Sequence, residues 1–389
     1  MRQGPGGTGS RAALLDGMTE QARGRREAAA AEVVELGSVD GFVVFDLPGA
    51  QASAGGTRLA PDVTVAEVAL LARAMTYKFG VLHAQMGGAK AGLRGDPADR
   101  AGHAALMARY CAEIRPMADA GRFLTGPDMG TSEEDFGPLR ERNAAPAAIS
   151  ATVDGVTFED VVTGFGVAVA AETALAATCG GGWAGRSVAI EGFGKVGGGV
   201  AAEVTRRGGR VGAVSSVAGC VADPGGLDIT RLLELRREHG DRCVTEYGRP
   251  VSPLAGLFAV AADVLVPGTR PGVISGRTAA ALPPQLRVVA PAANVPYTKA
   301  GAETLHQRGI VALPDFVCNA GAVIGYRSPG EATPAQVLAA VDTTIAGLIG
   351  EVTGGRDGPV AAACARAQAF VRGWWGEPPA PPYAPGDMA

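Results

Sequence analysis

A buried strand, a glycine-rich turn and an Ala-rich helix follow one another in the middle of the chain. Residues 187–191 read Ser-Val-Ala-Ile-Glu, and Gly192-Phe-Gly-Lys-Val-Gly197 comes directly after them. A second strand is predicted at residues 210–215. Such a strand–GxGxxG–helix–strand unit is typical of dinucleotide binding, because its glycines let a pyrophosphate approach the helix N-terminus. With both flanks in place, the motif predicts a Rossmann domain.

The cofactor residues predicted from this motif are Gly192, Phe193, Gly194, Lys195, Val196 and Gly197. In such domains an acid at the end of the second strand holds the ribose hydroxyls and repels a 2′-phosphate. Ser215 and Ser216 stand in that place here, and we assign Ser216 to the cofactor site. Without the acid, the sequence does not separate NAD from NADP.

A second unusual stretch places Lys78 and Lys90 in apolar surroundings, with Gly87 and Gly88 just before the second lysine. Lone lysines usually extend their ammonium group to water. The glycines favour a pocket instead, because they let the backbone approach a ligand closely. The capping box at Thr64 predicts a helix on which Lys78 shares a face with apolar residues. Asp128, in a loop between Pro127 and Met129, is by itself best explained as a turn or helix cap.

Composition excludes several classes of protein. A net charge of −4 over 389 residues gives no reason to expect nucleic acid or an anionic membrane as partner. No apolar run reaches about 18 residues, and the N-terminus lacks an apolar signal core. The cysteines form no CxxC pair and the histidines show no metal-ligand spacing, so we predict reduced thiols, no metal site and a cytoplasmic protein.

Hydrophobic patterns predict the remaining elements. Strands are expected at residues 41–48, 262–267, 286–290 and 310–314, and helices at 20–35, 65–77, 99–120, 158–178 and 334–372. Glycines near Thr163 in the long helix indicate close packing, since each costs about 1 kcal/mol in a helix. Residues 1–19 and 376–389 are expected to be disordered tails.

Several motifs occur in one order and resemble the glutamate/leucine/phenylalanine/valine dehydrogenase family. They are Gly55-Gly-Thr-Arg58, Met75-Thr-Tyr-Lys78, Gly87-Gly-Ala-Lys90, Gly126-Pro-Asp128, Thr163-Gly-Phe-Gly-Val167, the GxGxxG motif, Ala293-Asn294 and Pro314-Asp-Phe-Val-Cys-Asn-Ala-Gly321. The resemblance implies an α/β protein: an N-terminal α/β substrate domain at 20–150, a C-terminal Rossmann domain at 151–330 and a cleft between them. Closing helices at about 334–375 would pack back on the first domain.

This family catalyses the reversible oxidative deamination of an L-amino acid to its 2-oxo acid and ammonia, with NAD or NADP. Carried over by motif, Lys78 would bind the substrate α-carboxylate, Lys90 would activate water, and Asp128 would shuttle protons. Thr163, Asn294 and Asn319 resemble residues near the nicotinamide. The further substrate residues implied are Ala54, Gly55, Gly88, Val323 and Tyr326.

Two departures from the family pattern concern the substrate. Glutamate-specific members carry a lysine where this chain has Ala54 and a serine where it has Tyr326. An unpaired buried carboxylate costs several kcal/mol, so a non-acidic, apolar or aromatic substrate is expected. His83 and Gln85 are either pocket groups or surface groups, and Ala322 replaces a usual glycine.

Two alternatives stay open from the sequence. One is a catalytically altered member that serves as a dinucleotide-binding sensor or partner subunit; the joint presence of Lys78, Lys90 and Asp128 argues against it. The other is reductive amination of an unusual oxo acid in secondary metabolism. The expected partners are a small-molecule substrate and further copies of the chain in a homo-oligomer.

Overall fold

The computed structural model describes residues 30–139, 146–153 and 156–383. These residues form two compact units. The first contains the chain up to Ser150 together with Tyr326–Thr333 and Ala367–Pro381. The second contains Ala151–Gly325, Pro334–Arg366 and the chain from Pro382 onward.

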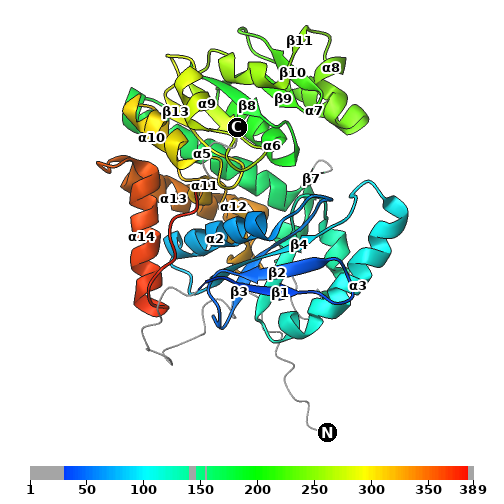
Figure 1. Ribbon diagram of the computed structural model, residues 1–389. Helices are drawn as coiled ribbons and strands as arrows, with labels where there is room; N and C mark the ends of the chain where they lie inside the picture. Colours follow the sequence, from blue (N-terminus) through cyan, green and yellow to red (C-terminus); the bar gives the residue numbers. More distant parts are fainter. Residues whose placement is uncertain (1–29, 140–145, 154–155, 384–389) are drawn as a thin grey trace. The chain divides into compact units, whose positions relative to one another are not determined.

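The first unit is built on a five-stranded mixed sheet (Figure 1). Its strands, in spatial order, are β1 (Glu32–Glu35), β2 (Gly41–Phe45), β4 (Gly87–Leu93), β3 (Ser53–Leu59) and β5 (Phe123–Pro127). β4 pairs antiparallel with β2 and parallel with β3. Its helices are α2 (Val65–Val81), α3 (Arg100–Asp119), η1 (Glu133–Leu139), α4 (Ala147–Ser150) and the second half of α14 (Pro359–Trp374).

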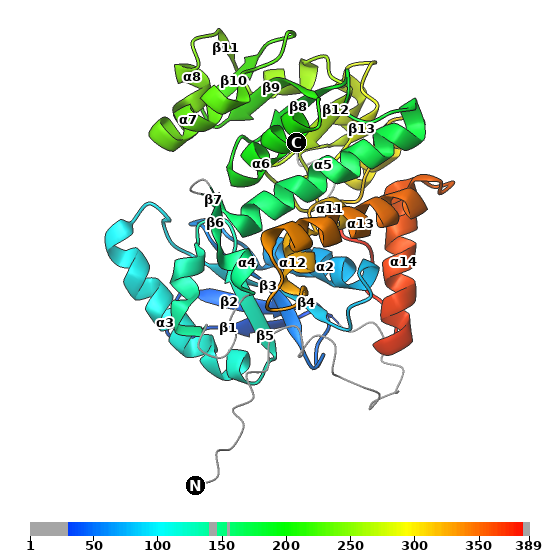
Figure 2. The ribbon, with the colours of Figure 1, turned by 180° about the vertical axis from the view of Figure 1, so that it is seen from behind.

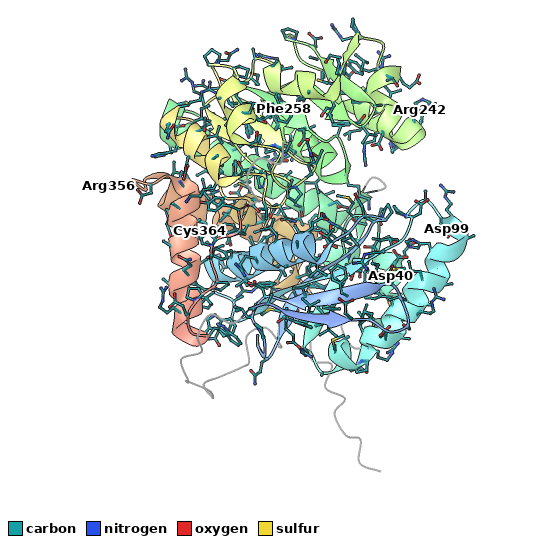
Figure 3. The ribbon with its side chains drawn as sticks, in the orientation of Figure 1. Asp40, Asp99, Arg242, Phe258, Arg356 and Cys364 are labelled. Atoms are coloured by element: carbon teal, nitrogen blue, oxygen red, sulfur yellow. The ribbon has the colours of Figure 1, made fainter. Side chains whose placement is uncertain are left out.

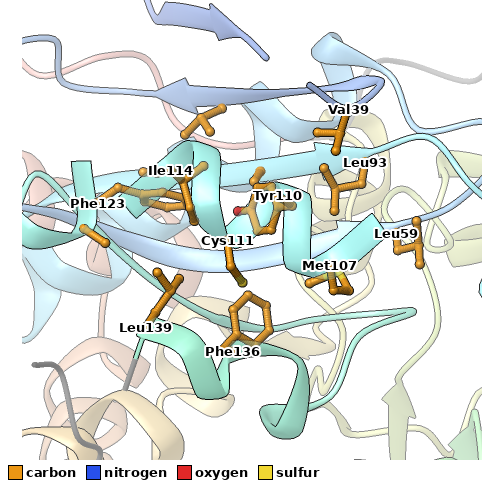
Figure 4. Packing of buried hydrophobic residues seen from close by; sticks show 14 of the residues in the cluster. Val39, Leu59, Leu93, Met107, Tyr110, Cys111, Ile114, Phe123, Phe136 and Leu139 are labelled. Atoms are coloured by element: carbon orange, nitrogen blue, oxygen red, sulfur yellow. The ribbon is translucent and has the colours of Figure 1, made fainter. Parts of the chain in front are cut away.

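The two long helices cover opposite faces of this sheet. On one face Met107, Tyr110 and Ile114 of α3 pack in a cluster with Leu93 of β4 and Phe123 of β5 (Figure 4). On the other face the cluster joins Phe42 and Val44 of β2 to Val68 and Ala72 of α2. Because side chains alternate along a strand, Lys90 lies on the α2 face, opposite its neighbours Ala89 and Ala91.

The second unit contains a seven-stranded sheet of Rossmann type. Its strands, in spatial order, are β11 (Val251–Ser252), β10 (Gly219–Ala222), β9 (Arg210–Ser216), β8 (Ser187–Glu191), β12 (Val264–Pro267), β13 (Val288–Val289) and β14 (Val311–Ala312). The five strands from β9 to β14 pair in parallel. A separate hairpin joins β6 (Thr152–Val153) to β7 (Val156–Thr157).

The helical elements of the second unit are α5 (Phe158–Cys179), α6 (Lys195–Arg206), α7 (Ile229–His239), η2 (Gly240–Arg242), α8 (Cys243–Glu246), η3 (Leu254–Ala259), α9 (Gly276–Ala281), α10 (Lys299–Gln307), α11 (Asp315–Cys318), α12 (Gly321–Tyr326) except its last residue, α13 (Pro334–Thr353) and the first half of α14. α5 lies beside α13 (Figure 2). A Cβ on Gly164 would lie 2.7 Å from the backbone nitrogen of Val200 in α6, so only a glycine permits this close crossing. The packing predicted from the helix glycines is confirmed.

Most predicted elements are present, and the strands β3, β5, β10 and β11 were not predicted. Residues 32–35 form the edge strand β1 instead of the end of a helix, and residues 20–29 of that predicted helix lie outside the described part. The glycine- and lysine-rich stretch at 87–93 is a fully buried strand, which the pattern did not predict. Residues 334–366 group with the second unit.

The C-terminal segment also differs from the prediction. Pro378, Pro379 and Pro382 are buried, and two backbone carbonyls of the segment accept hydrogen bonds from α2. The prediction of disorder is therefore wrong for residues 376–383. Residues 1–19 and 384–389, the rest of the predicted tails, lie outside the described part.

Among the helices of the described residues, two, α5 and α13, are long and apolar enough to cross a membrane when judged by length and composition alone. Of the apolar window in α5, 61% is buried inside the protein. Because α5 packs against α6 and α13, its apolar character is that of a core helix, and the finding is weak evidence for a membrane span.

Candidate active site

The site in the first unit is built around Lys90 and Asp128. Lys90 lies in the central strand β4, and Asp128 directly follows the edge strand β5. Their side chains form an ion pair with exposed fractions of only 6% and 14%. Asp128 Oδ1 also accepts a 2.6 Å hydrogen bond from the backbone nitrogen of Met129 and lies 3.4 Å from Nη2 of Arg58. The two residues that the sequence assigned to proton transfer are therefore in direct contact.

The charge state of this pair follows from its neighbours. Burial by itself raises the pKa of Asp128, but the positive charges of Lys90 and then Arg58 outweigh it and hold the pKa well below its usual range. The carboxylate of Asp128 is thus ionised at rest. Asp128 is not the helix cap that its local sequence suggests; it is one partner in a charged cluster.

Two consecutive glycines of β3 make room for this cluster. A Cβ on Gly55 would lie 1.7 Å from the backbone oxygen of Ala89, and one on Gly56 would lie 2.9 Å from Asp128 Cβ and 3.2 Å from Lys90 Nζ. Any side chain at these positions would displace the strand or the ion pair. Gly56 was not among the predicted site residues, although the Gly-Gly-Thr-Arg motif contains it.

Lys78 lies in the last turn of α2, and the residue is only 6% exposed. The helix begins at Thr64, whose hydroxyl accepts a hydrogen bond from the backbone nitrogen of Glu67, as the capping box predicts. Glu67 also forms an ion pair with Arg58. The capping glutamate therefore links the start of α2 to the cation beside Asp128, a link that the sequence pattern did not indicate.

The glycine-rich loop Gly192–Gly197 in the second unit makes a tight turn that runs directly into helix α6. Gly192 has a φ of +89°, and a Cβ on it would lie 2.9 Å from Thr269 Cγ2. A Cβ on Gly197 would lie 1.9 Å from the oxygen of Gly192, so the turn and the helix approach each other closely. At Gly194, the N-cap of α6, a Cβ would meet no atom of the described residues within 4 Å. This open helix N-terminus fits the dinucleotide predicted from the motif.

The other residues of the loop differ in exposure. Phe193 is buried and its backbone nitrogen donates to Ser215 O at 2.6 Å, whereas Lys195 is exposed and lies 3.6 Å from Asp160. Val196 is half-buried. Glu191, the last residue of β8, accepts hydrogen bonds from both Gly268 N and Thr269 N. It thereby joins two loops at this sheet edge, a role that the motif alone does not predict.

Ser216 is the last residue of β9, as the position of the missing acid requires. Its hydroxyl donates to the backbone oxygen of Asp241 at 2.5 Å and accepts from Ala218 N. Asp241 is exposed, and so is the next residue, Arg242, which is labelled in Figure 3. The η2 turn, which is hydrogen-bonded to Ser216, thus carries the acidic Asp241 next to the cationic Arg242.

Two predicted nicotinamide residues meet in the second unit. Asn319 Nδ2 donates to Asn294 Oδ1 at 2.9 Å and to Ala292 O at 3.1 Å. Thr163, whose hydroxyl donates to Glu159 O, lies in α5, and a Cβ on Gly321 would lie 3.1 Å from Thr163 Cα. The segment of Asn319 therefore packs directly on the helix of Thr163.

The predicted side-chain residues are distributed over both units. Ala54 of β3 and Tyr326 are both half-buried in the first unit, whereas the half-buried Val323 is assigned to the second. His83 and Gln85 are exposed, and the His83 ring stacks on Phe370 with centroids 4.9 Å apart, which favours the surface alternative. Ala322 is half-buried in α12.

All six cysteines lie in the described ranges and are free thiols. Within these ranges, no group of three or more His, Cys, Asp or Glu side chains could hold a metal ion.

Comparison with known proteins gives one family for both units. The model "Glu/Leu/Phe/Val dehydrogenase, dimerisation domain" matches residues 38–143, and "Glutamate/Leucine/Phenylalanine/Valine dehydrogenase" matches residues 155–327. The chain is 31% identical over 281 residues to a glutamate dehydrogenase of Thermotoga maritima, covering 69% of this chain and 67% of that relative. The chain belongs to the glutamate/leucine/phenylalanine/valine dehydrogenase family.

Another relative and two solved structures extend the comparison. A glutamate dehydrogenase of Aeropyrum pernix is 29% identical over 69% of this chain and 66% of its own length, slightly less than two thirds. The hetero-hexameric glutamate dehydrogenase of Thermus thermophilus, in a leucine-bound form, has a TM-score of 0.72 at 25% identity, with 88% of each chain covered. The L-tryptophan dehydrogenase of Nostoc punctiforme shares the fold, with a TM-score of 0.59, 20% identity and 90% and 97% of the two chains covered.

The family and the α/β fold predicted from the sequence are therefore confirmed. The relatives are named amino-acid dehydrogenases, and one, from Pyrobaculum calidifontis, is named NADP(+)-dependent at 30% identity over 69% of this chain and 67% of its own length. The predicted class of enzyme and the predicted use of NAD or NADP agree with these relatives.

Proposed function

We propose that this protein is an NAD(P)-dependent L-amino-acid dehydrogenase for a non-acidic substrate. The observation that carries the proposal is the buried Lys90–Asp128 ion pair, with a second buried lysine, Lys78, in the same unit. An amino-acid oxidation needs an anchor for the α-carboxylate and a proton relay at the α-carbon. A sensor that only binds a dinucleotide needs neither group, so the pair argues against the alternative of an inactive member.

The chain's own residues supply the acid–base steps of this proposal. Lys78 binds the α-carboxylate, and Asp128 is ready to accept a proton because the flanking cations keep it ionised. As the α-amine of the substrate loses its proton, Asp128 accepts it. Once the hydride has left the α-carbon, Lys90 in its neutral form takes a proton from the water that attacks the imine carbon, and as an ammonium it then stabilises the carbinolamine. The nicotinamide, when bound, accepts the hydride from the α-carbon.

The substrate class is proposed from Ala54 and Tyr326. A substrate side-chain carboxylate would need a buried cation as partner, and neither residue supplies one. Two arginines of the first unit are already engaged: Arg58 by Glu67 and Asp128, and Arg327 by the backbone oxygen of Leu82 at 2.9 Å. Neutral apolar or aromatic amino acids therefore suit this site better than glutamate or aspartate.

The remaining parts of the proposal concern the cofactor and the assembly. Ser216 in place of an acid favours use of both NAD and NADP. A homo-oligomer in the cytoplasm is proposed, by analogy with the family's dimerisation domain, although the Thermus thermophilus neighbour is a hetero-hexamer. The same residues serve the reaction in both directions, so reductive amination of an unusual oxo acid is the second candidate function.

One assay tests this function. The purified enzyme is incubated at alkaline pH with NAD or NADP and with glutamate, leucine, valine, phenylalanine or tryptophan, and the reduced cofactor is followed by absorbance. The proposal expects turnover with one or more neutral amino acids and little with glutamate. Glutamate as the best substrate would overturn the substrate class, and no reduction with any amino acid would overturn the activity.

A further inference from the structure

Helix α2 and strand β4 touch backbone to backbone at Gly88. A Cβ on Gly88 would lie 1.9 Å from the oxygen of Ala72 and 2.4 Å from the nitrogen of Thr76, both in α2. No other residue permits this approach. At the contact, the backbone nitrogen of Gly88 donates a 3.0 Å hydrogen bond to the hydroxyl of Thr76.

Asp46, the residue directly after strand β2, closes this contact into a ring of hydrogen bonds. Thr76 Oγ1 donates to Asp46 Oδ2 at 2.6 Å, and the backbone nitrogen of Asp46 donates to the oxygen of Gly88 at 2.9 Å. Arg73, one turn before Thr76, donates from Nε to Asp46 Oδ1 at 2.5 Å. The Asp46 side chain is fully buried and Thr76 is 1% exposed.

This ring sits next to both lysines. Thr76 precedes Lys78 by two residues in α2, and Gly88 precedes Lys90 by two residues in β4. The ring thus ties helix α2, which carries Lys78, to strand β4, which carries Lys90. A shift of α2 along or away from β4 would change the spacing between the two ammonium groups.

A ring of this kind is not needed for packing alone. Burial raises the pKa of Asp46, although the Arg73 charge and the hydrogen bonds from Thr76 and Arg73 oppose the rise, so the carboxylate is held in an unfavourable place. A buried network is stable only when all its members are paired, and an apolar contact would avoid its cost. What the network adds is a unique register between helix and strand.

We propose that Thr76 and Asp46 are positioning residues that fix Lys78 and Lys90 relative to each other for catalysis. The inference rests on the proposed amino-acid dehydrogenase function, since it assigns the two lysines to one substrate. Neither Thr76 nor Asp46 needs to touch the substrate or the cofactor in this role.

The C-terminal segment holds the same helix from another side. Arg73 Nη1 donates to the oxygen of Ala380 at 2.9 Å, and Tyr77 OH donates to the oxygen of Pro379 at 2.7 Å. Gln368 of α14 donates to the Tyr77 hydroxyl at 2.8 Å. The residues on either side of Thr76 are thereby tethered, which restricts the movement of α2 further.

The test compares Thr76→Val, Thr76→Ser and the control Thr57→Val in the full chain. Valine keeps the shape of threonine and removes the hydroxyl, whereas serine keeps the hydroxyl. Thr57 is a matched control: it is fully buried, and its hydroxyl lies 2.6 Å from Tyr110 OH and 2.8 Å from Thr125 Oγ1 on the α3 face of the same sheet. Both valine variants therefore lose buried hydrogen bonds in one unit.

The measurements are kcat, the KM for the amino acid, the Kd for the reduced cofactor by fluorescence, and the melting temperature. We expect Thr76→Val to lower kcat/KM by about tenfold to a hundredfold, with a change in kcat as well as KM and an unchanged cofactor Kd. Thr76→Ser should recover most of the loss. Thr57→Val should lower the melting temperature similarly and keep kcat/KM within about twofold.

A second readout needs no turnover. Lys78 and Lys90 are labelled with an amine-reactive ester, and the rate at each residue is followed by peptide mass spectrometry. Labelling of both lysines should accelerate several-fold in Thr76→Val and stay unchanged in Thr57→Val. Unchanged labelling in Thr76→Val, unchanged kcat/KM in that variant, or an equal loss in Thr57→Val would overturn the positioning role. Absence of turnover in the unmodified enzyme would instead contradict the proposed function.

Discussion

Replacing Gly88 with alanine directly tests the close contact between helix α2 and strand β4 in the first unit. The added Cβ would lie 1.9 Å from the oxygen of Ala72, whereas carbon–oxygen contacts are ordinarily about 3.3 Å or longer. Helix α2 must therefore retreat from β4 by about 1 Å or more, taking Lys78 with it. A displacement of this size costs about a hundredfold in rate, and overpacking costs about 1–3 kcal/mol of stability.

The assay measures kcat/KM for the amino acid, the free energy of unfolding in urea and the cofactor Kd. Gly330→Ala is the control, because a Cβ on Gly330, in the same unit, would meet no described atom within 4 Å. Gly88→Ala should lose activity and stability together while the cofactor Kd stays unchanged. A Gly88→Ala enzyme with unaltered kcat/KM and stability would refute the close contact between α2 and β4.

Three further predictions concern cofactor, substrate and pH. Ser216→Asp should raise the KM for NADP by at least about tenfold through charge repulsion, while the KM for NAD stays about the same. A greater preference for NADP in this variant would mean that Ser216 is not at the ribose site. Tyr326→Ala should raise kcat/KM for tryptophan relative to valine, and an unchanged ratio would remove Tyr326 from the pocket. Folding lowers the pKa of the Asp128 carboxyl below its usual range. The ionised carboxylate therefore stabilises the folded state fully above about pH 4, the ordinary carboxyl pKa, and this stabilisation is lost as the pH falls below that value. The difference in melting temperature between the parent and Asp128→Asn should therefore shrink below that pH, and a constant difference would contradict the ion pair with Lys90.

The sequence predicted the second unit well because its signals are local. The strand at 187–191 and the glycines from Gly192 to Gly197 are a continuous pattern whose spacing the backbone geometry requires. Ser216 was placed correctly at the end of its strand for the same reason. The helix glycines at Gly164 and Gly166 likewise indicated close packing, which α6 and α13 provide.

The first unit was harder to predict. Glycine and alanine are poor strand formers, so the pattern did not reveal that residues 87–93 are the central strand of a sheet. The contact between Lys90 and Asp128 joins two distant segments, and only the family motifs suggested it. Residues 32–35 pair with β2 as an edge strand, where tertiary pairing overrides the helical preference of an Ala- and Glu-rich segment.

The most direct test of the central claim is hydride transfer by Lys90→Ala and Asp128→Asn with the best neutral amino acid, deuterated at the α-carbon. The label in the reduced cofactor is counted by mass spectrometry, and cofactor binding is measured alongside. The account predicts label transfer by the unmodified enzyme and a loss of about a hundredfold or more in each variant, with the cofactor still bound. Near-parental transfer by either variant would contradict the assignment of Lys90 and Asp128 to the chemistry.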